Sequence, residues 1–390
     1  MWYMFLFCFL CQFLFRFCFG PQHPASHGVL VIILNCSNEF LLYLDLQLGY
    51  LHRGTEKLME FKSFEQGLPY FDRLDYVSVV FNEHLFSLAF ESLLRVSLCL
   101  RVSYLRLLFL ELTRVFNGLL SLSCSLFDLG SMSPLLWSFE ERDKFSTFFD
   151  YVCGVRMHLA FICLCGVLDD FTFGCLDFLF FLNSSCFLLC DLVDHFVLTN
   201  RFVYLRLRGL TLLSFWDLCF NSLSGVLARC CGLLWDVRLF SCYELYSLFF
   251  YCFSLSFSGD AMDRFVLRLF DMRNSLLLCK QFLFWFLLFG FLSFLDFILN
   301  FDFLIDTLIY VFYMVWLIFC VGFSFAVIEH PKGEFSLVLV LFYFGFVRCR
   351  LRCADFLSVL LLDVLCRGFL LADLVAVIGN LDCVFGSVDR

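Results

Sequence analysis

Two histidines, His23 and His27, stand four residues apart in the segment GPQHPASHGV, in a chain that has only seven histidines. On a helix this spacing would place two imidazoles on one face, where they can bind zinc. Two glycines and two prolines surround them, however, and these residues predict a turn or loop. Three interpretations remain open on this pattern alone: a zinc site, a structural loop and a loop that borders a substrate.

Two later motifs, LHRGTEKLMEFKS and GLPYFDRLDYVS, contribute Arg53, Arg73 and Tyr76. A phenol with a pKa of ~10 and an imidazole with a pKa of ~6.5 can each deliver a proton to a basic oxygen. The arginines supply positive charge. The plain alternatives are that Tyr76 is a core residue with a satisfied hydroxyl and that the arginines are salt-bridge partners.

The elements that must position these side chains are mostly helical, with strands at both ends of the chain. Apolar and β-branched residues over 29–48, interrupted by polar residues at 35–38, predict a hairpin around a turn. A second hairpin is predicted over 325–350, with the polar island Pro331 to Glu334 at its start. Between the two hairpins, the longest predicted helices cover 104–127, 139–150 and 260–280.

A further helix carries a polar stripe. Glu83, Ser87, Glu91 and Arg95 recur every four residues in an otherwise apolar segment, which places them on one helical face. Glu91 and Arg95 have the spacing of an ion pair across one turn. We find no internal repeat and no hydrophilic linker along the chain.

The motifs GPQHPASHG, LHRGTEK and PYFDRLDY occur in the order and at the spacing of one family. In them the chain resembles the quinone-site subunit of respiratory complex I, the NADH dehydrogenase subunit 7 family, which is related to the large subunit of nickel–iron hydrogenases. The resemblance covers residues 20–275 and 326–390. It implies an α+β fold that is mostly α, a helical bundle with small antiparallel β elements at both ends. The expected parts are an apolar leader (1–19), an N-terminal β region with a quinone loop (20–55), a helical domain (56–322), and a C-terminal hairpin with a terminal segment (323–390).

The resemblance implies a core peripheral-arm subunit of mitochondrial NADH:ubiquinone oxidoreductase, catalytic only within that complex, with ubiquinone as the substrate. It places His27 and Tyr76 at the two quinone carbonyls as hydrogen-bond and proton donors. It places Asp128 behind the histidine, where a carboxylate orients the imidazole and favours its protonated form. The alternative for Asp128 is a solvated aspartate near a helix end.

The resemblance also assigns residues to a cofactor that this chain does not hold. Arg53, Arg73 and His158 would face the terminal 4Fe–4S cluster of a neighbouring subunit. Positive charge near a cluster stabilises its reduced, more negative state, and a titrating histidine makes its potential pH-dependent. The expected partners are therefore this cluster-bearing neighbour, the other peripheral-arm subunits and the membrane arm.

Hydrogenase chemistry is not expected here. The early cysteine pair of those enzymes aligns with Asp75 and Ser78, the late pair aligns with Val384 and Ser387, and Cys383 stands where they have proline. Soft metals need thiolate ligands, so we predict that the chain binds no nickel–iron centre and no other metal. The 23 cysteines show no disulfide framework, which favours a reducing compartment.

Two more features limit the chemistry. No Gly-x-Gly occurs in the sequence, so it has neither a dinucleotide-binding loop nor a Walker loop, and NADH must be oxidised on another subunit. After Arg-x-x-Asn, where most family members have histidine, this chain has Gly118. A proton step that uses that histidine is not available here.

Composition taken alone suggests other classes. The chain is 62% hydrophobic with a mean hydropathy of +0.89, as in polytopic transporters or channels; a hydrogenase-like metalloenzyme is the second alternative. We attribute the apolar bias to U-rich codons for Phe, Leu and Cys, as in some organelle genomes. The formal charge of −9 argues against nucleic acid as a partner. The predicted location is the matrix side of the inner mitochondrial membrane.

The stretch 307–328 lacks charge and as a helix is long enough to cross a bilayer. Three aspartates precede it, and no Lys or Arg occurs from Gln281 through Pro331, so it has no basic anchor. We therefore predict that no part of the chain spans a membrane. Residues 1–19 are apolar but lack a basic start and a cleavage site, which argues against a secretory peptide.

Overall fold

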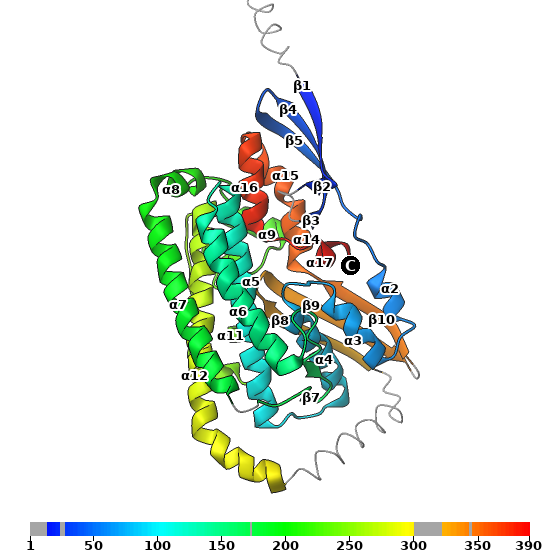
Figure 1. Cartoon of the computed structure of the whole chain (residues 1–390). Helices are drawn as coiled ribbons and strands as arrows, with labels where there is room; N and C mark the ends of the chain where they lie inside the picture. Colours follow the sequence, from blue (N-terminus) through cyan, green and yellow to red (C-terminus); the bar gives the residue numbers. More distant parts are fainter. Residues whose placement is uncertain (1–13, 24–27, 172–173, 300–321, 343–344) are drawn as a thin grey trace, which may run out of the picture.

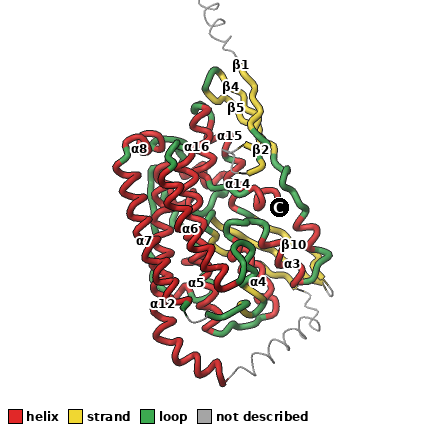
Figure 2. The backbone as a smooth tube through the Cα atoms, in the orientation of Figure 1, coloured by secondary structure: helices red, strands yellow, loops and turns green. Residues whose placement is uncertain are grey.

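A computed structural model describes residues 14–23, 28–171, 174–299, 322–342 and 345–390. The fold is α+β and mostly α, as predicted: a bundle of long helices with small antiparallel sheets formed by the N-terminal and C-terminal regions (Figure 1, Figure 2). Buried apolar side chains from Leu30 to Val388 form one continuous core. The sheets and the bundle therefore share a core.

The N-terminal sheet has three antiparallel strands in the order β1-β4-β5, which are Leu14–Phe19, Val31–Ser37 and Phe40–Gln47. The predicted hairpin is confirmed as β4 and β5, but its turn falls at Asn38, whose φ of 56° suits a tight turn. Strand β1 lies inside the segment expected to be an apolar leader and pairs with β4 along its length. Residues 1–13 lie outside the described residues.

In the described part of the chain, five long helices make the bundle: α4 (Val79–Leu94), α5 (Leu100–Asp128), α6 (Ser133–Cys153), α7 (Cys175–Thr199) and α12 (Ala261–Leu299). The predicted helices over 104–127, 139–150 and 260–280 correspond to α5, α6 and α12. Helix α5 lies at the centre and packs against α6, α12 and α16 (Leu371–Leu381). Its inner position explains why most of its residues are apolar on every side.

The predicted Glu91–Arg95 ion pair is wrong. Helix α4 ends at Leu94, and Arg95 is exposed in the left-handed conformation. Glu91 is buried and instead binds Arg106 of α5, whose Nη1 and Nη2 lie 2.9 and 2.6 Å from its two carboxylate oxygens. A buried carboxylate needs a cation that is also inside the protein, because an exposed arginine cannot offset the loss of water.

The C-terminal sheet has the order β10-β9-β8, with β8 at Gly322–His330, β9 at Gly333–Phe342 and β10 at Gly345–Arg352. The predicted hairpin is present, but Pro331 and Lys332 form the turn between β8 and β9 rather than preceding the hairpin. Proline has no N–H to give to a ladder, so it suits a turn. Strands β8 and β9 pack on α4.

The rest of the described residues form short elements and the loops between them. The strands are β2 (Gln22–His23), β3 (Gly28–Val29), β6 (Ile162–Cys163) and β7 (Gly166–Val167). The helices are α2 (Thr55–Met59), α3 (Phe64–Asp72), α8 (Arg201–Leu207), α9 (Phe215–Asn221), α10 (Val226–Cys230), α11 (Val237–Phe240), η2 (Tyr246–Leu248), α14 (Ala354–Leu360), α15 (Leu362–Cys366) and α17 (Phe385–Asp389).

Two helices in the described part of the chain are long and apolar enough to cross a membrane. They are Leu100–Asp128, of which 83% of the apolar window is buried inside the protein, and Cys175–Val197, of which 39% is buried. The first is the central helix of the bundle, so its apolar character is explained by packing. Most of the stretch 307–328 lies outside the described residues.

Candidate functional site

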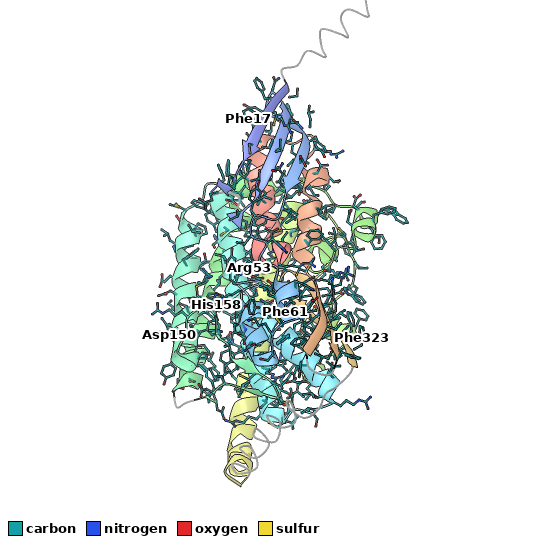
Figure 3. The ribbon with its side chains drawn as sticks, turned by 90° about the vertical axis from the view of Figure 1, so that its right-hand side faces the viewer. Phe17, Arg53, Phe61, Asp150, His158 and Phe323 are labelled. Carbon is teal, nitrogen blue, oxygen red and sulfur yellow. The ribbon has the colours of Figure 1, made fainter. Side chains whose placement is uncertain are left out.

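Three candidates that carry or can take up positive charge come from separate segments and lie together. Arg53 follows the N-terminal sheet, and its guanidinium donates to the backbone carbonyl of Arg73, just after α3. Arg73 in turn donates to the carbonyl of Pro69 at 2.7 Å. The half-buried ring of His158 lies next to the backbone of Asp72. Figure 3 shows Arg53 and His158 near each other on one face of the molecule.

The pKa values of these side chains show the effect of their neighbours' charges. Burial lowers the pKa of His158, and the positive charges of Arg73 and Arg53 lower it further. Burial and the charge of Arg73 also lower the pKa of Arg53. Because like charges this close repel one another, the cluster favours a negatively charged neighbour.

The backbone that carries Arg53 is held by the last residues of the chain. The carboxylate of Asp389 accepts from the N–H groups of Gly49 and Leu51 at 3.0 and 2.7 Å. The backbone N–H of Arg53 donates to the carbonyl of Arg390 at 3.1 Å. This role of Asp389 could not be predicted from the sequence, because its partners lie near the opposite end of the chain and no local pattern indicates them.

Tyr76 follows Arg73 by three residues and is 37% exposed. It lines a hollow together with Arg156, Met157 and Leu159, from the segment that carries His158, and with Thr113 and Phe116 of α5. Burial raises the pKa of its phenol, with Asp75 adding to the rise. At neutral pH the hydroxyl therefore carries its proton and can donate it.

Of the other two predicted site residues, the structure describes only Asp128. His27 lies outside the described residues; its neighbour Gly28 packs so closely on Phe385 that a Cβ there would come within 2.6 Å of the ring. Asp128 is half-buried at the end of α5. It lies 12 residues beyond Phe116, which along a helix is ~18 Å.

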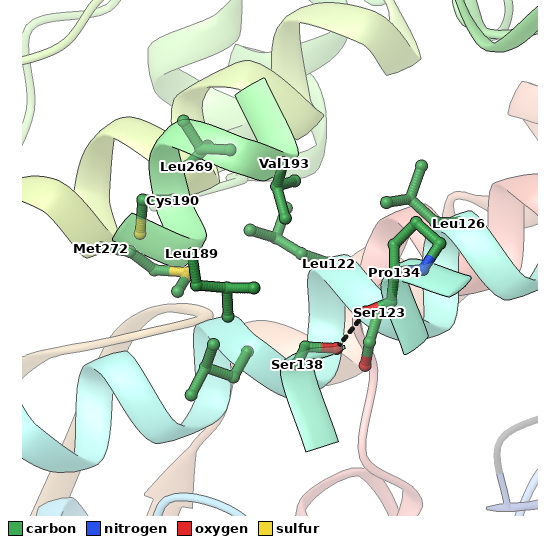
Figure 4. Close-up of a pocket in the computed structure, with 11 residues that line it drawn as sticks. Leu122, Ser123, Leu126, Pro134, Ser138, Leu189, Cys190, Val193, Leu269 and Met272 are labelled. Atoms are coloured by element: carbon green, nitrogen blue, oxygen red, sulfur yellow. Dashed lines mark hydrogen bonds between the residues drawn. The ribbon is translucent and has the colours of Figure 1, made fainter. Parts of the chain in front are cut away.

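A second hollow lies inside the bundle, between α5, α6, α7 and α12 (Figure 4). Its walls are almost entirely apolar, and one of its few polar groups, the Ser138 hydroxyl, already donates to the carbonyl of Pro134 at 2.7 Å. Met272 lines it and also covers Gly118, where a Cβ would meet the methionine at 2.5 Å. The space that a histidine side chain would need at position 118 is therefore filled by Met272.

The positions aligned with hydrogenase ligands do converge. Gly386 packs against the backbone next to Asp75, with a built Cβ only 2.4 Å from the carbonyl oxygen of Leu74. Asp75 is buried, and its carboxylate lies 2.9 Å from the ammonium of Lys332 and 3.3 Å from the ring of His330. A protonated amine cannot be a ligand, so this pocket does not fit a nickel–iron centre. Within the described residues no three His, Cys, Asp or Glu side chains are grouped to hold a metal.

Replacing Cys383 with serine should change the free energy of unfolding by no more than about 0.5–1 kcal/mol. Its thiol is buried and lies 3.2 Å from the hydroxyl of Ser358, and burial raises its pKa to about 12, so it is a neutral thiol at neutral pH. Thermal denaturation and metal analysis of the purified complex check this expectation. Loss of a bound metal in the variant would favour the hydrogenase-like alternative.

Comparison with known proteins agrees with the motifs. The family model of the respiratory-chain NADH dehydrogenase 49 kDa subunit matches residues 128–289 and 300–390. The chain is 60% identical to the NADH-ubiquinone oxidoreductase 49 kDa subunit homolog of Trypanosoma brucei brucei, over 97% of this chain and 98% of that protein. It is 38% identical to the 49 kDa subunit of Prototheca wickerhamii, over 95% and 96% of the two chains. It is also 36% identical to the 49 kDa subunit of Acanthamoeba castellanii, over 95% of each chain.

These alignments run through both the helical bundle and the two terminal sheets, and their extent leaves no large part of the chain unmatched. Neither a transporter nor a metal-binding hydrogenase is among these relatives, which are subunits of an enzyme complex. The chain therefore belongs to the 49 kDa subunit family of NADH–ubiquinone oxidoreductase and is a core subunit of respiratory complex I.

Proposed function

We propose that this chain forms the ubiquinone headgroup site of the complex, beside the terminal 4Fe–4S cluster of a neighbouring subunit. The observation that carries the proposal is the cluster of Arg53, Arg73 and His158, which come from separate segments, together with Tyr76, three residues after Arg73. Three are cations or potential cations, and the fourth is a partly exposed proton donor. A site that transfers electrons and protons to a quinone needs both kinds of group.

The reaction adds two electrons and two protons to ubiquinone. The neighbour's cluster supplies the electrons. In this chain, Tyr76 donates a proton at one carbonyl oxygen and His27 donates at the other, while Asp128 orients the histidine. Each donor first holds a hydrogen bond to the carbonyl and gives up its proton as the oxygen becomes basic. The assay that tests this is ubiquinone reduction by the intact complex with Tyr76 or His27 replaced.

His158→Met should leave the complex assembled and flatten the pH dependence of the cluster's midpoint potential. The lowered pKa of His158 keeps the ring neutral near neutral pH while the cluster is oxidised. Reduction adds negative charge and favours proton uptake, so the potential should fall with rising pH above the oxidised-state pKa, by at most ~59 mV per pH unit. The variant cannot take up this proton. A redox titration followed by EPR that gives an unchanged slope would reject the placement of His158.

We further propose that the chain sits on the matrix side of the inner mitochondrial membrane, in the peripheral arm, with no span of its own. When a chaotrope dissociates the peripheral arm from the membrane arm, this subunit should follow the soluble fraction, as the burial of α5 supports. Immunoblotting of the two fractions checks this. Recovery with the lipid-embedded fraction would contradict it.

A further inference from the structure

The interior next to Tyr76 is unusually rich in charge. Lys332, in the turn between β8 and β9, has a side chain that is only 2% exposed and an ammonium 2.9 Å from the carboxylate of Asp75. The two groups form an ion pair inside the protein. Burial lowers the pKa of the adjacent His330 to about 3, and its ring is therefore neutral at neutral pH.

A second charge reaches the same place from another element. Asp382 ends α16 in the left-handed conformation, and its carboxylate accepts from the amide of Asn117 at 3.1 Å. Asn117 follows Phe116, which lines the hollow with Tyr76. The Lys332–Asp75 pair thus lies one residue before Tyr76 in the chain, and Asp382 is bound by the residue that follows Phe116 of the same hollow. The charges of Lys332, Asp75 and Asp382 all affect the pKa of the Tyr76 phenol.

Three other charged groups lie around this interior. Asp355 is buried, accepts a hydrogen bond from Ser387, and has its pKa raised by burial to about 6. Arg268 faces Asp382 and donates to the carbonyl of Asn380. Arg156 lines the outer wall of the hollow with a side chain that is 59% exposed, so water screens its charge.

We propose that Lys332 and Asp382 are positioning residues that set how readily Tyr76 gives its proton to the quinone, an inference that rests on the proposed function. When the O–H bond of Tyr76 breaks and an O–H bond forms on the quinone, a phenolate remains. The ammonium of Lys332 stabilises that phenolate, and the carboxylate of Asp382 opposes it. The electrons come from the neighbour's iron–sulfur cluster, and the phenolate regains its proton from water through the exposed side of the ring.

The two charges act with opposite sign, and this gives the test. In Lys332→Met, the alkaline limb of the pH profile of ubiquinone reduction should shift to higher pH by about one pH unit, because Tyr76 becomes a weaker acid. For the same reason the rate at a fixed pH should fall. In Asp382→Asn, the alkaline limb should shift to lower pH, and the rate at a fixed pH should rise. Both are measured in the intact complex, with Lys332→Arg expected to keep the wild-type limb. Lys280→Met, on the exposed face of α12, is the matched control and should change neither.

The outcomes separate this inference from the proposed function. Suppose that Tyr76→Phe has lost quinone reduction. The roles of Lys332 and Asp382 are then overturned if the alkaline limb and the rate stay unchanged in both variants, or if they move in the same direction in both. If Tyr76→Phe keeps quinone reduction, it is the proposed function that fails. Should Lys332→Met not assemble, because Asp75 is left without its cation, the isosteric Asp382→Asn decides alone: a lowered limb and a faster rate support the inference, and no change overturns it.

Discussion

Replacing Tyr76 with phenylalanine, or His27 with alanine, should each abolish most of the ubiquinone reductase activity of the complex. Loss of one hydrogen bond to the headgroup should weaken binding by only ~1 kcal/mol. Loss of a proton donor should slow the reaction by ~10²–10⁴, so the effect should appear in kcat much more than in KM. Ubiquinone reduction by purified complex, with NADH as the electron source, is the measurement.

Electron flow from NADH to an artificial acceptor should survive in both variants, because those electrons leave the complex before the quinone. Tyr50→Phe is a matched control: Tyr50 is also a partly exposed tyrosine near the N-terminal sheet, and its hydroxyl has only a long contact of 3.4 Å to Gln47. This control should keep full activity. Normal quinone reduction in both Tyr76→Phe and His27→Ala would contradict the assignment of the site.

Arg106→Met should destabilise the subunit by about 3–5 kcal/mol, enough to prevent or greatly reduce assembly of the complex. Arg106 is fully buried, binds Glu91 through two hydrogen bonds, and lies 3.3 Å from Glu244. It also donates to the backbone carbonyl of Cys163 at 2.9 Å. Methionine would leave these carboxylates inside the protein without their cation, and this cost is far larger than that of a lost surface pair.

Native gel electrophoresis and the thermal denaturation of any assembled complex measure this effect. Arg95→Met is the matched control, because Arg95 is exposed at the end of α4, and it should assemble as the wild type does. The double variant Arg106→Met with Glu91→Gln should recover part of the loss, since it removes an uncompensated charge. Normal assembly of Arg106→Met together with failure of Arg95→Met would show that Glu91 pairs with its near neighbour after all.

Much of the architecture could be predicted because its signals are local. The hairpin of β4 and β5 follows from apolar runs around a polar turn, and α5, α6 and α12 follow from length and helical pattern. The motifs around Arg53, Arg73 and Tyr76 were enough to indicate the family, and the structure brings Arg53 and Arg73 together with His158. That they would meet could be expected only through the resemblance.

The partners of the buried charges were decided by the tertiary structure. Sequence spacing favoured Arg95 for Glu91, since an i,i+4 pair is the nearest choice on an exposed helix. In the structure Glu91 pairs with Arg106 instead, because a buried carboxylate needs a cation that is buried as well. In the same way, Asp75 forms an ion pair with Lys332, and the loop before Arg53 donates hydrogen bonds to Asp389. Both pairs of partners are far apart in the sequence. Local sequence patterns cannot predict partners that are so far apart along the chain, because only the tertiary fold brings these groups into contact.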